Sequence, residues 1–254
     1  MQVEGLALTQ PVAFITGASV RIGQAISRKL HAEGYSVWLH YRNSIEQAQQ
    51  LADQLNAQRE HSAHILSGHL DLTIDIEAML AIIKAKDGPF GGRLDVLVNN
   101  ASAFYPTPVA DVDDRQWKQI INTNLRAPFL LSQGLANRLA EHNGCIVNIT
   151  DIHAEKPMAN HTLYSVSKAG LVSMTQSLAK ELAPAIRTNA ISPGAILWPK
   201  REETDTEYHA KILAQIPLER LGKLENIADT VWFIVSNDYV NGQVIKIDGG
   251  KSLS

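Results

Sequence analysis

Residues 16–23 read TGASVRIG, and this stretch decides the fold. It follows a short run of β-forming residues, 12–16, and leads into an apolar-periodic run, 22–33, that predicts a helix. A glycine-containing turn between a strand and a helix can hold a pyrophosphate, because the helix N-terminus offers free N–H groups. An ordinary strand-to-helix turn would also need the two glycines, so the rest of the chain decides between the two interpretations.

Strand-like and helix-like runs alternate along the rest of the chain. Strands are predicted at 12–16, 37–41, 64–70, 94–98, 145–149, 188–192 and 244–247, and helices at 22–33, 45–58, 75–86, 114–139, 162–182 and 227–236. The strands are nearly continuous apolar runs, which predicts that helices cover both of their faces. The sequence therefore predicts an α/β fold with a doubly wound, Rossmann-type parallel sheet of seven strands and helices on both faces, in a single domain over 1–254.

Composition excludes several classes of protein. The 254 residues are 45% hydrophobic and 19% charged, with a formal net charge of −3, which argues against a nucleic-acid partner. The apolar runs are too short for a membrane helix, so no membrane partner is expected. The single Cys145 excludes an intrachain disulfide and is consistent with a cytoplasmic location. His61, His64 and His69 lie close together but lack the spacing of a metal motif, so no metal site is expected.

The end of the second predicted strand indicates which dinucleotide binds. An NAD site normally places an acid there to hold the ribose hydroxyls, whereas residues 40–44 read HYRNS and no acid precedes Glu46. Arg42 can pair with a 2′-phosphate, and Asn43 and Ser44 can donate hydrogen bonds to it. An exposed loop arginine is the plain alternative for Arg42. Because the acid is missing, the sequence predicts NADPH rather than NADH.

A tyrosine and a lysine lie four residues apart in the predicted helix 162–182. This spacing puts Tyr164 and Lys168 on one helix face, where the ammonium favours the phenolate and lowers the pKa of the tyrosine. An ionised Asp151, just after the fifth strand, would raise that pKa, so the sign of the net shift stays open. A tyrosine so placed can deliver a proton to a reacting atom. Asn124, a polar residue in the helix 114–139, is either a satisfied buried amide or part of a proton relay.

These motifs together resemble a known family. TGxxxRxG, NNAS at 99–102, Asn124, YxxxK at 164–168 and SPG at 192–194 occur in the order of the short-chain dehydrogenase/reductase family, and the resemblance extends over residues 11–250. Within that family the sequence is most similar to the pteridine reductases. The similarity rests on Arg21 in place of a glycine, Asp151 in place of a serine, and NNAS in place of NNAG.

The resemblance implies a reaction, a cofactor and a set of site residues. NADPH would give a hydride to a C=N carbon of a pterin or folate, such as a dihydropterin, and Tyr164 would supply a proton with Asp151, Lys168 and Asn124. The substrate would contact Arg21, Ser102, Phe104, Asp151 and Tyr164. The predicted cofactor-binding residues are Gly17, Arg21, Ile22, Gly23, His40, Tyr41, Arg42, Asn43, Ser44, Asp71, Leu72, Asn99, Asn100, Ala101, Thr150, Tyr164, Lys168, Pro193 and Gly194.

Two other functions are weighed against this one. The first is a carbonyl or 3-oxoacyl-carrier-protein reductase of the same family, against which Arg21 and Asp151 argue, since a ketone would prefer a serine donor at position 151. The second is a non-catalytic NADPH sensor, against which the intact Tyr164, Lys168 and Asn124 argue. The segment 196–207 is where this family places its substrate lid.

A homotetramer is also expected. The apolar residues of the helix 162–182 are too many for one stripe that faces the sheet, so a second copy would cover the rest. These residues are Ala169, Leu171, Val172, Met174 and Leu178. Together with the helix 114–139 they would form the contact between subunits, and the family resemblance implies the same assembly.

Overall fold

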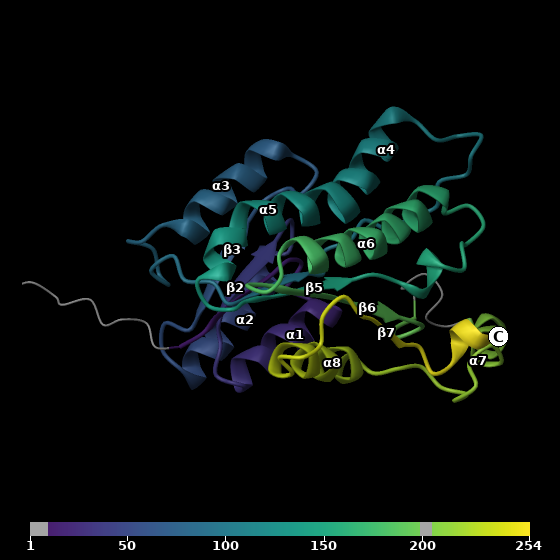
Figure 1. The fold of residues 1–254 in the computed structure, drawn as a ribbon. Helices are drawn as coiled ribbons and strands as arrows, with labels where there is room; N and C mark the ends of the chain where they lie inside the picture. The colour runs from purple at the N-terminus through teal and green to yellow at the C-terminus, as the bar shows by residue number, and fades with distance from the viewer. Residues whose placement is uncertain (1–9, 199–204) are drawn as a thin grey trace, which may run out of the picture.

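A seven-stranded parallel sheet runs through the middle of the molecule, with helices above and below it (Figure 1). The structure is a computed structural model and describes residues 10–198 and 205–254. The strand order is β3-β2-β1-β4-β5-β6-β7. The strands are β1 Val12–Ile15, β2 Ser36–Tyr41, β3 Ala63–Ser67, β4 Val96–Asn99, β5 Cys145–Ile149, β6 Arg187–Pro193 and β7 Val244–Ile247. Strands are therefore added outward in one direction from β1 to β3 and in the other direction from β4 to β7, so the strand order reverses between β1 and β4. This confirms the predicted doubly wound α/β class.

Two groups of helices cover the two faces of the sheet (Figure 1). One group holds α1 Arg21–Ala32, α2 Ile45–Gln58 and α8 Leu224–Ser236, and the other holds α3 Thr73–Lys84, α4 Asp114–Ile121, α5 Ala127–Ala140 and α6 Thr162–Glu181. Alternate side chains of each strand enter opposite cores, because successive residues of a strand point to opposite faces. In β1, Ala13 and Ile15 enter the core with α1 and α8, while Val12 and Phe14 enter the core with α3 and α5.

The predicted continuous helix over 114–139 is wrong in its middle. It consists of α4, a π-helical turn η1 Asn122–Arg126, and α5. Pro128 explains the interruption: its ring nitrogen cannot donate to the carbonyl four residues back, and the ring crowds that carbonyl. The N–H of Ala127 accordingly bonds to the carbonyl of Asn122, five residues back. The wider turn carries Asn124, so this local distortion positions a predicted site residue.

Other elements also differ from the prediction: β3 ends at Ser67 rather than 70, α3 begins at Thr73 rather than 75, and α8 begins at Leu224 rather than 227. Helix α7 Thr206–Leu213 has no counterpart in it, and it lies beside the C-terminus (Figure 1). The fourth strand begins at Val96 rather than 94, because Asp95 is used as a brace at its start. The carboxylate of Asp95 accepts from the backbone N–H of Val12 at 2.8 Å and pairs with Arg93. The predicted lid segment 196–207 lies only partly within the described residues, since 199–204 are outside them.

Within 10–198 and 205–254, no helix combines the length and apolarity that crossing a membrane requires. The same ranges hold no group of three or more His, Cys, Asp or Glu side chains that could hold a metal ion. His64 packs instead against the rings of Trp38 and Phe90, with centroid distances of 5.9 and 5.2 Å.

Candidate active site

A cleft of about 980 Å³ lies at the carboxyl edge of the sheet. Every site residue predicted from the sequence lines it, except Asp71, Leu72, Asn99 and Asn124. Among the described residues of its lining, four side chains are cationic and one is an ionisable acid, Asp151. The cleft of a chain with net charge −3 is thus locally positive, which suits a ligand that carries phosphates.

The turn after β1 is tightly built. Gly17 has φ +62°, and a Cβ on Gly23 would lie 2.0 Å from the Gly17 carbonyl oxygen, so this position accepts only glycine. The side-chain amide of Asn100 donates to the carbonyl oxygens of Thr16 and Gly17 at 2.8 and 3.1 Å. Helix α1 then begins with no side-chain cap and no acid in its first turn. Its first N–H groups therefore remain available to an anion in the cleft.

Arg21 holds an unfavourable backbone conformation at this turn. Its φ is +52°, in the left-handed region that a residue with a Cβ adopts at a cost of about 1–2 kcal/mol. Strain of this kind persists only where the surrounding structure enforces it, and it concentrates at functional sites. The result is an arginine on the cleft wall at the N-terminus of α1.

The His40 side chain holds the backbone of this turn in place through two hydrogen bonds. Its Nδ1 accepts from the Gly17 N–H at 3.0 Å, and its Nε2 donates to the Gly68 carbonyl oxygen at 3.1 Å. Burial lowers the pKa of His40 from 6.5 to about 4, so the ring is neutral at pH 7. His40 therefore positions the turn, and because it also lines the cleft, its contact with the cofactor stays a prediction.

The loop after β2 carries Arg42, Asn43 and Ser44 along the same wall of the cleft. The hydroxyl groups of Ser44 and Ser19 lie 2.6 Å apart and join this loop to the first turn. Sequence reasoning missed Ser19, although it is one of the few polar residues of the quoted turn. The two loops together form a polar, cationic pocket without a described acid, as a phosphorylated ribose would require.

The predicted catalytic group assembles at the centre of the cleft. The Tyr164 hydroxyl donates to Asp151 Oδ2 at 2.7 Å, and Asp151 Oδ1 accepts from the backbone N–H of His153 at 2.8 Å. The Lys168 ammonium donates to the Ile149 carbonyl oxygen at 2.9 Å and lies 5.7 Å from the centroid of the Tyr164 ring. Tyr164 and Lys168 share one face of α6, as their spacing predicts, and both are at least 95% buried.

The surroundings of Tyr164 determine the direction of its pKa shift, which the sequence leaves open. Burial, and then the charge and hydrogen bond of Asp151, raise the pKa of Tyr164 well above its usual value, while a hydrogen bond with Ser102 acts weakly in the other direction. Burial lowers the pKa of Lys168 to about 8, against the attraction of Asp151. Tyr164 is therefore a neutral hydroxyl in this form of the site, a state from which it can donate a proton.

Phe104 lines the cleft next to the tyrosine and is half exposed. Its ring stacks on His161 with a centroid distance of 4.9 Å and meets Tyr164 edge-on at 4.7 Å. Because His161 covers one face of the ring, a flat ligand could stack at most on the other face. His161 immediately precedes α6 and was not recognised from the sequence, where nothing links it to position 104.

Asn124 and Asn99 serve the architecture rather than the cleft wall. Asn124 Oδ1 accepts from the Ala103 N–H at 2.7 Å, and its Nδ2 donates to the Ala103 carbonyl oxygen and to Ser167 Oγ at 2.9 and 3.1 Å. Asn124 is thus a buried, hydrogen-bonded amide that fixes the loop carrying Phe104, and its part in a proton relay stays a prediction. The side chain of Asn99 donates to Asn148 Oδ1 at 2.8 Å, inside the sheet.

Asp71 and Leu72 line a neighbouring groove instead of the main cleft. Gln119 borders both, so the groove continues from the cleft. The Asp71 Oδ1 atom is buried and has no hydrogen-bond partner among the described residues. Asp71 and Leu72 thus lie in a groove that adjoins the cleft, and their contact with the adenine stays a prediction.

Comparisons with known proteins agree with this geometry. The family model described as Enoyl-(Acyl carrier protein) reductase matches residues 17–252. Pteridine reductase 1 of Leishmania tarentolae is 34% identical, over 97% of this chain and 98% of that protein. The 3-oxoacyl-[acyl-carrier-protein] reductase FabG of Staphylococcus aureus (strain Mu50 / ATCC 700699) is 33% identical over 94% and 96%. The granaticin polyketide synthase putative ketoacyl reductase 2 of Streptomyces violaceoruber is 33% identical over 96% of each chain.

The chain belongs to the short-chain dehydrogenase/reductase family. It is an oxidoreductase of the kind that uses a nicotinamide dinucleotide. The residues present fit such a group: a short-chain dehydrogenase/reductase needs an open helix N-terminus beside the first turn, and α1 has no cap there. Pro193 ends β6 and Gly194 follows it, and both line the cleft; a Cβ on Gly194 would lie 2.6 Å from Asp248 Cβ.

Proposed function

We propose that this protein reduces a C=N bond in the ring of a dihydropterin or dihydrofolate with NADPH. The observation that carries the proposal is the hydrogen bond between Tyr164 and Asp151, at 2.7 Å. An ionised carboxylate only accepts hydrogen bonds, and so does a ketone oxygen, so Asp151 would repel a carbonyl substrate. A pterin ring presents N–H groups at its edge, and these complement the carboxylate.

The side chains of the cleft then have separate roles. Bound NADPH supplies the hydride. Tyr164, kept neutral by its surroundings, donates the proton that the ring nitrogen needs, and Asp151 holds its hydroxyl and accepts from a ring N–H. The free face of Phe104 stacks on the ring, and the Lys168 ammonium, anchored on Ile149, adds positive charge below it.

The preference for NADPH rests on the loop after β2. Arg42 and Ser44 line the cleft, and no described residue of the lining is acidic except Asp151, which lies beside Tyr164. A 2′-phosphate would find charge-assisted donors in this loop, while the ribose hydroxyls of NADH would find no carboxylate.

A 3-oxoacyl thioester reductase is the second candidate, because relatives with that activity in their names are as similar as the pteridine reductase. The test is the rate of NADPH oxidation with 7,8-dihydrobiopterin and with a 3-oxoacyl thioester, for the wild type and for Asp151→Ser. We expect the wild type to prefer the dihydropterin, and Asp151→Ser to depress dihydropterin reduction more than ketone reduction. Unchanged kcat/KM for the dihydropterin in Asp151→Ser would refute the role given to this carboxylate.

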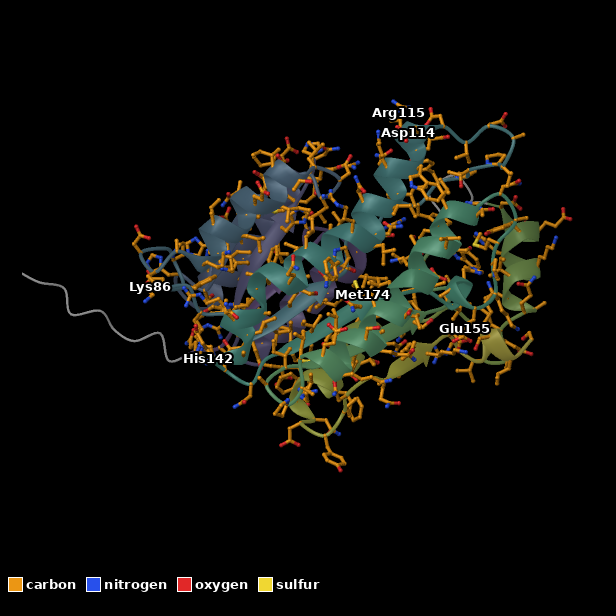
Figure 2. All side chains as sticks on the ribbon, turned by 45° about the horizontal axis from the view of Figure 1, so that its top comes forward. Lys86, Asp114, Arg115, His142, Glu155 and Met174 are labelled. Carbon is orange, nitrogen blue, oxygen red and sulfur yellow. The ribbon has the colours of Figure 1, made fainter. Side chains whose placement is uncertain are left out.

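We also propose a homotetramer that pairs α4, α5 and α6 with those of other copies. Figure 2 looks onto this face, with Met174 near its centre. Trp117, Phe129 and Val166 are 43–50% exposed on these helices. Of the apolar residues named from the sequence, Leu171 and Leu178 are buried in their own core, so the contact would use Ala169, Val172 and Met174. Light scattering at micromolar concentration should give four times 27.9 kDa, and a single chain mass would refute the assembly.

A cytoplasmic location remains part of the proposal. Cys145 is fully enclosed in β5, and burial raises the pKa of its thiol to about 11. It therefore stays a protonated, unreactive thiol, as a reducing compartment would also keep it. Cell fractionation with the tagged protein checks the location.

A further inference from the structure

The C-terminal turn is built to hold one side chain in place. After β7 the chain turns through Gly249 and Gly250, with φ of +64° and +87°, into the short helix η4 Lys251–Leu253. The carboxylate of Asp248 accepts from the N–H groups of Gly250 and Ser252 at 3.0 and 2.8 Å. A Cβ on Gly250 would lie 2.9 Å from the Pro217 ring, so this turn packs tightly against the segment after α7.

Three further contacts tie this turn to the rest of the protein. Lys246 in β7 pairs with Glu155 at 2.5 Å, and the Lys156 ammonium donates to the carbonyl oxygen of Ser254. The Ser254 hydroxyl donates to the carbonyl oxygen of Gln215 at 2.9 Å. The last residues of the chain therefore bridge the loop that follows Asp151 and the end of α7, as their position in Figure 1 shows.

Lys251 is the residue that this turn presents to the cleft. It lines the cleft and is half-buried, and its ammonium makes no hydrogen bond or ion pair with any residue in the described ranges. Burial lowers its pKa, while the charge of Asp151 raises it, so the two groups lie within electrostatic reach. A cation that lines the same cleft as Asp151, without a direct partner among the described residues, is placed to bind an anion.

The surrounding wall suits the extended part of a substrate. Tyr208 and Ile212 of α7 line the cleft, as does Trp198, whose ring stacks on His209 of α7 with a centroid distance of 3.8 Å. Apolar and aromatic surface in the same cleft as the Lys251 ammonium matches an aromatic linker that ends in a carboxylate. Arg21 and Arg42, in contrast, lie on the two loops of the dinucleotide side.

We propose that Lys251 forms a subsite for a carboxylate on the substrate tail, so that the cleft favours a pterin with an anionic tail over one with a neutral tail. This inference rests on the proposed function and names the substrate class within it. The Coulomb attraction acts on the tail and not on the reacting ring, so it lowers KM for the tailed substrate without changing the chemical step. Since the ammonium is partly exposed, the expected effect is about tenfold.

The experiment compares 7,8-dihydrofolate with 7,8-dihydrobiopterin at saturating NADPH. The measured quantity is the ratio of their kcat/KM values in the wild type, Lys251→Met and Lys251→Arg, at low and at high salt. Lys211→Met is the matched control, because Lys211 is an exposed lysine of α7 that does not line the cleft. Thermal unfolding of each variant establishes that it is folded.

We expect Lys251→Met to lower the dihydrofolate-to-dihydrobiopterin ratio about tenfold through KM, Lys251→Arg to preserve it, and Lys211→Met to leave it unchanged. High salt should reduce the wild-type ratio toward that of Lys251→Met. Equal loss for both substrates, or no change in the ratio, would overturn the subsite while leaving the pterin activity in place. Failure of the wild type to reduce either pterin would instead overturn the proposed function and the subsite with it.

Discussion

Replacing His40 with glutamine tests how the phosphate turn responds to acid. His40 is 2% exposed, accepts from the Gly17 N–H and donates to the Gly68 carbonyl oxygen, so only the neutral ring with its proton on Nε2 satisfies both contacts. Protonation of Nδ1 would place an N–H opposite the N–H of Gly17, so the hydrogen bond between them would be lost. A glutamine amide offers one acceptor and one donor as well, but it does not titrate.

The size of the effect follows from the pKa of His40. Burial lowers it from 6.5 to about 4, against the hydrogen bond to Gly68. Between these values the unfolded chain binds the proton and the folded chain does not, so stability is highest above pH 6.5 and falls as the pH drops toward 4. At about 1.4 kcal/mol per pH unit, the 2.5-unit difference amounts to roughly 3 kcal/mol. Burial also lowers the pKa of His31 to about 4, so a second histidine adds to the wild-type slope.

The assay is urea unfolding at a series of pH values from 7.5 to 4. We expect the free energy of unfolding of His40→Gln to fall less steeply than that of the wild type, by about 1.4 kcal/mol per pH unit between pH 6.5 and 4. His142→Gln is the control, because His142 is exposed at the far end of the molecule (Figure 2), and it should keep the wild-type slope. The comparison of slopes is independent of any stability that the glutamine loses at pH 7. Identical slopes for His40→Gln and the wild type would refute the buried neutral histidine.

Three further predictions concern the cleft. Tyr164→Phe should lower kcat by roughly 10²–10⁴-fold with the NADPH affinity preserved, and full activity in stopped-flow assays would contradict its role as proton donor. Arg42→Gln should weaken the binding of NADPH by about 1.5–3 kcal/mol and leave the binding of NADH unaffected. Equal kcat/KM values of the wild type for the two cofactors would contradict the preference. Gly23→Ala should abolish cofactor binding in calorimetry, because its Cβ would lie 2.0 Å from the Gly17 carbonyl oxygen. Gly34→Ala, whose Cβ meets nothing within 4 Å, should reduce stability through its φ of +96° but still bind cofactor.

Local patterns made the framework predictable. The apolar runs predict all seven strands, because burial on both faces leaves a direct mark on a strand's composition. The six predicted helices account for every described α-helix except α7. The interruption of the helix 114–139 was also visible in the sequence as Pro128, but a proline inside an amphipathic pattern does not say whether the helix ends, kinks or widens. Helix α7 carries no buried residue, so it left no apolar stripe by which to recognise it.

The sequence by itself determined the parallel sheet, the glycine turn, and the placement of Tyr164 and Lys168 on one helix face, since each follows from preferences and spacings within a few residues. Only the tertiary structure decided that Tyr164 donates to Asp151 and has a raised pKa, because desolvation depends on everything packed around the pair. The tertiary structure also decided that Asn124 accepts a hydrogen bond from the Ala103 N–H. It likewise brought Lys251, near the end of the sequence, to the wall of the cleft. These contacts join segments far apart in sequence, and no local pattern encodes the packing that brings such segments together.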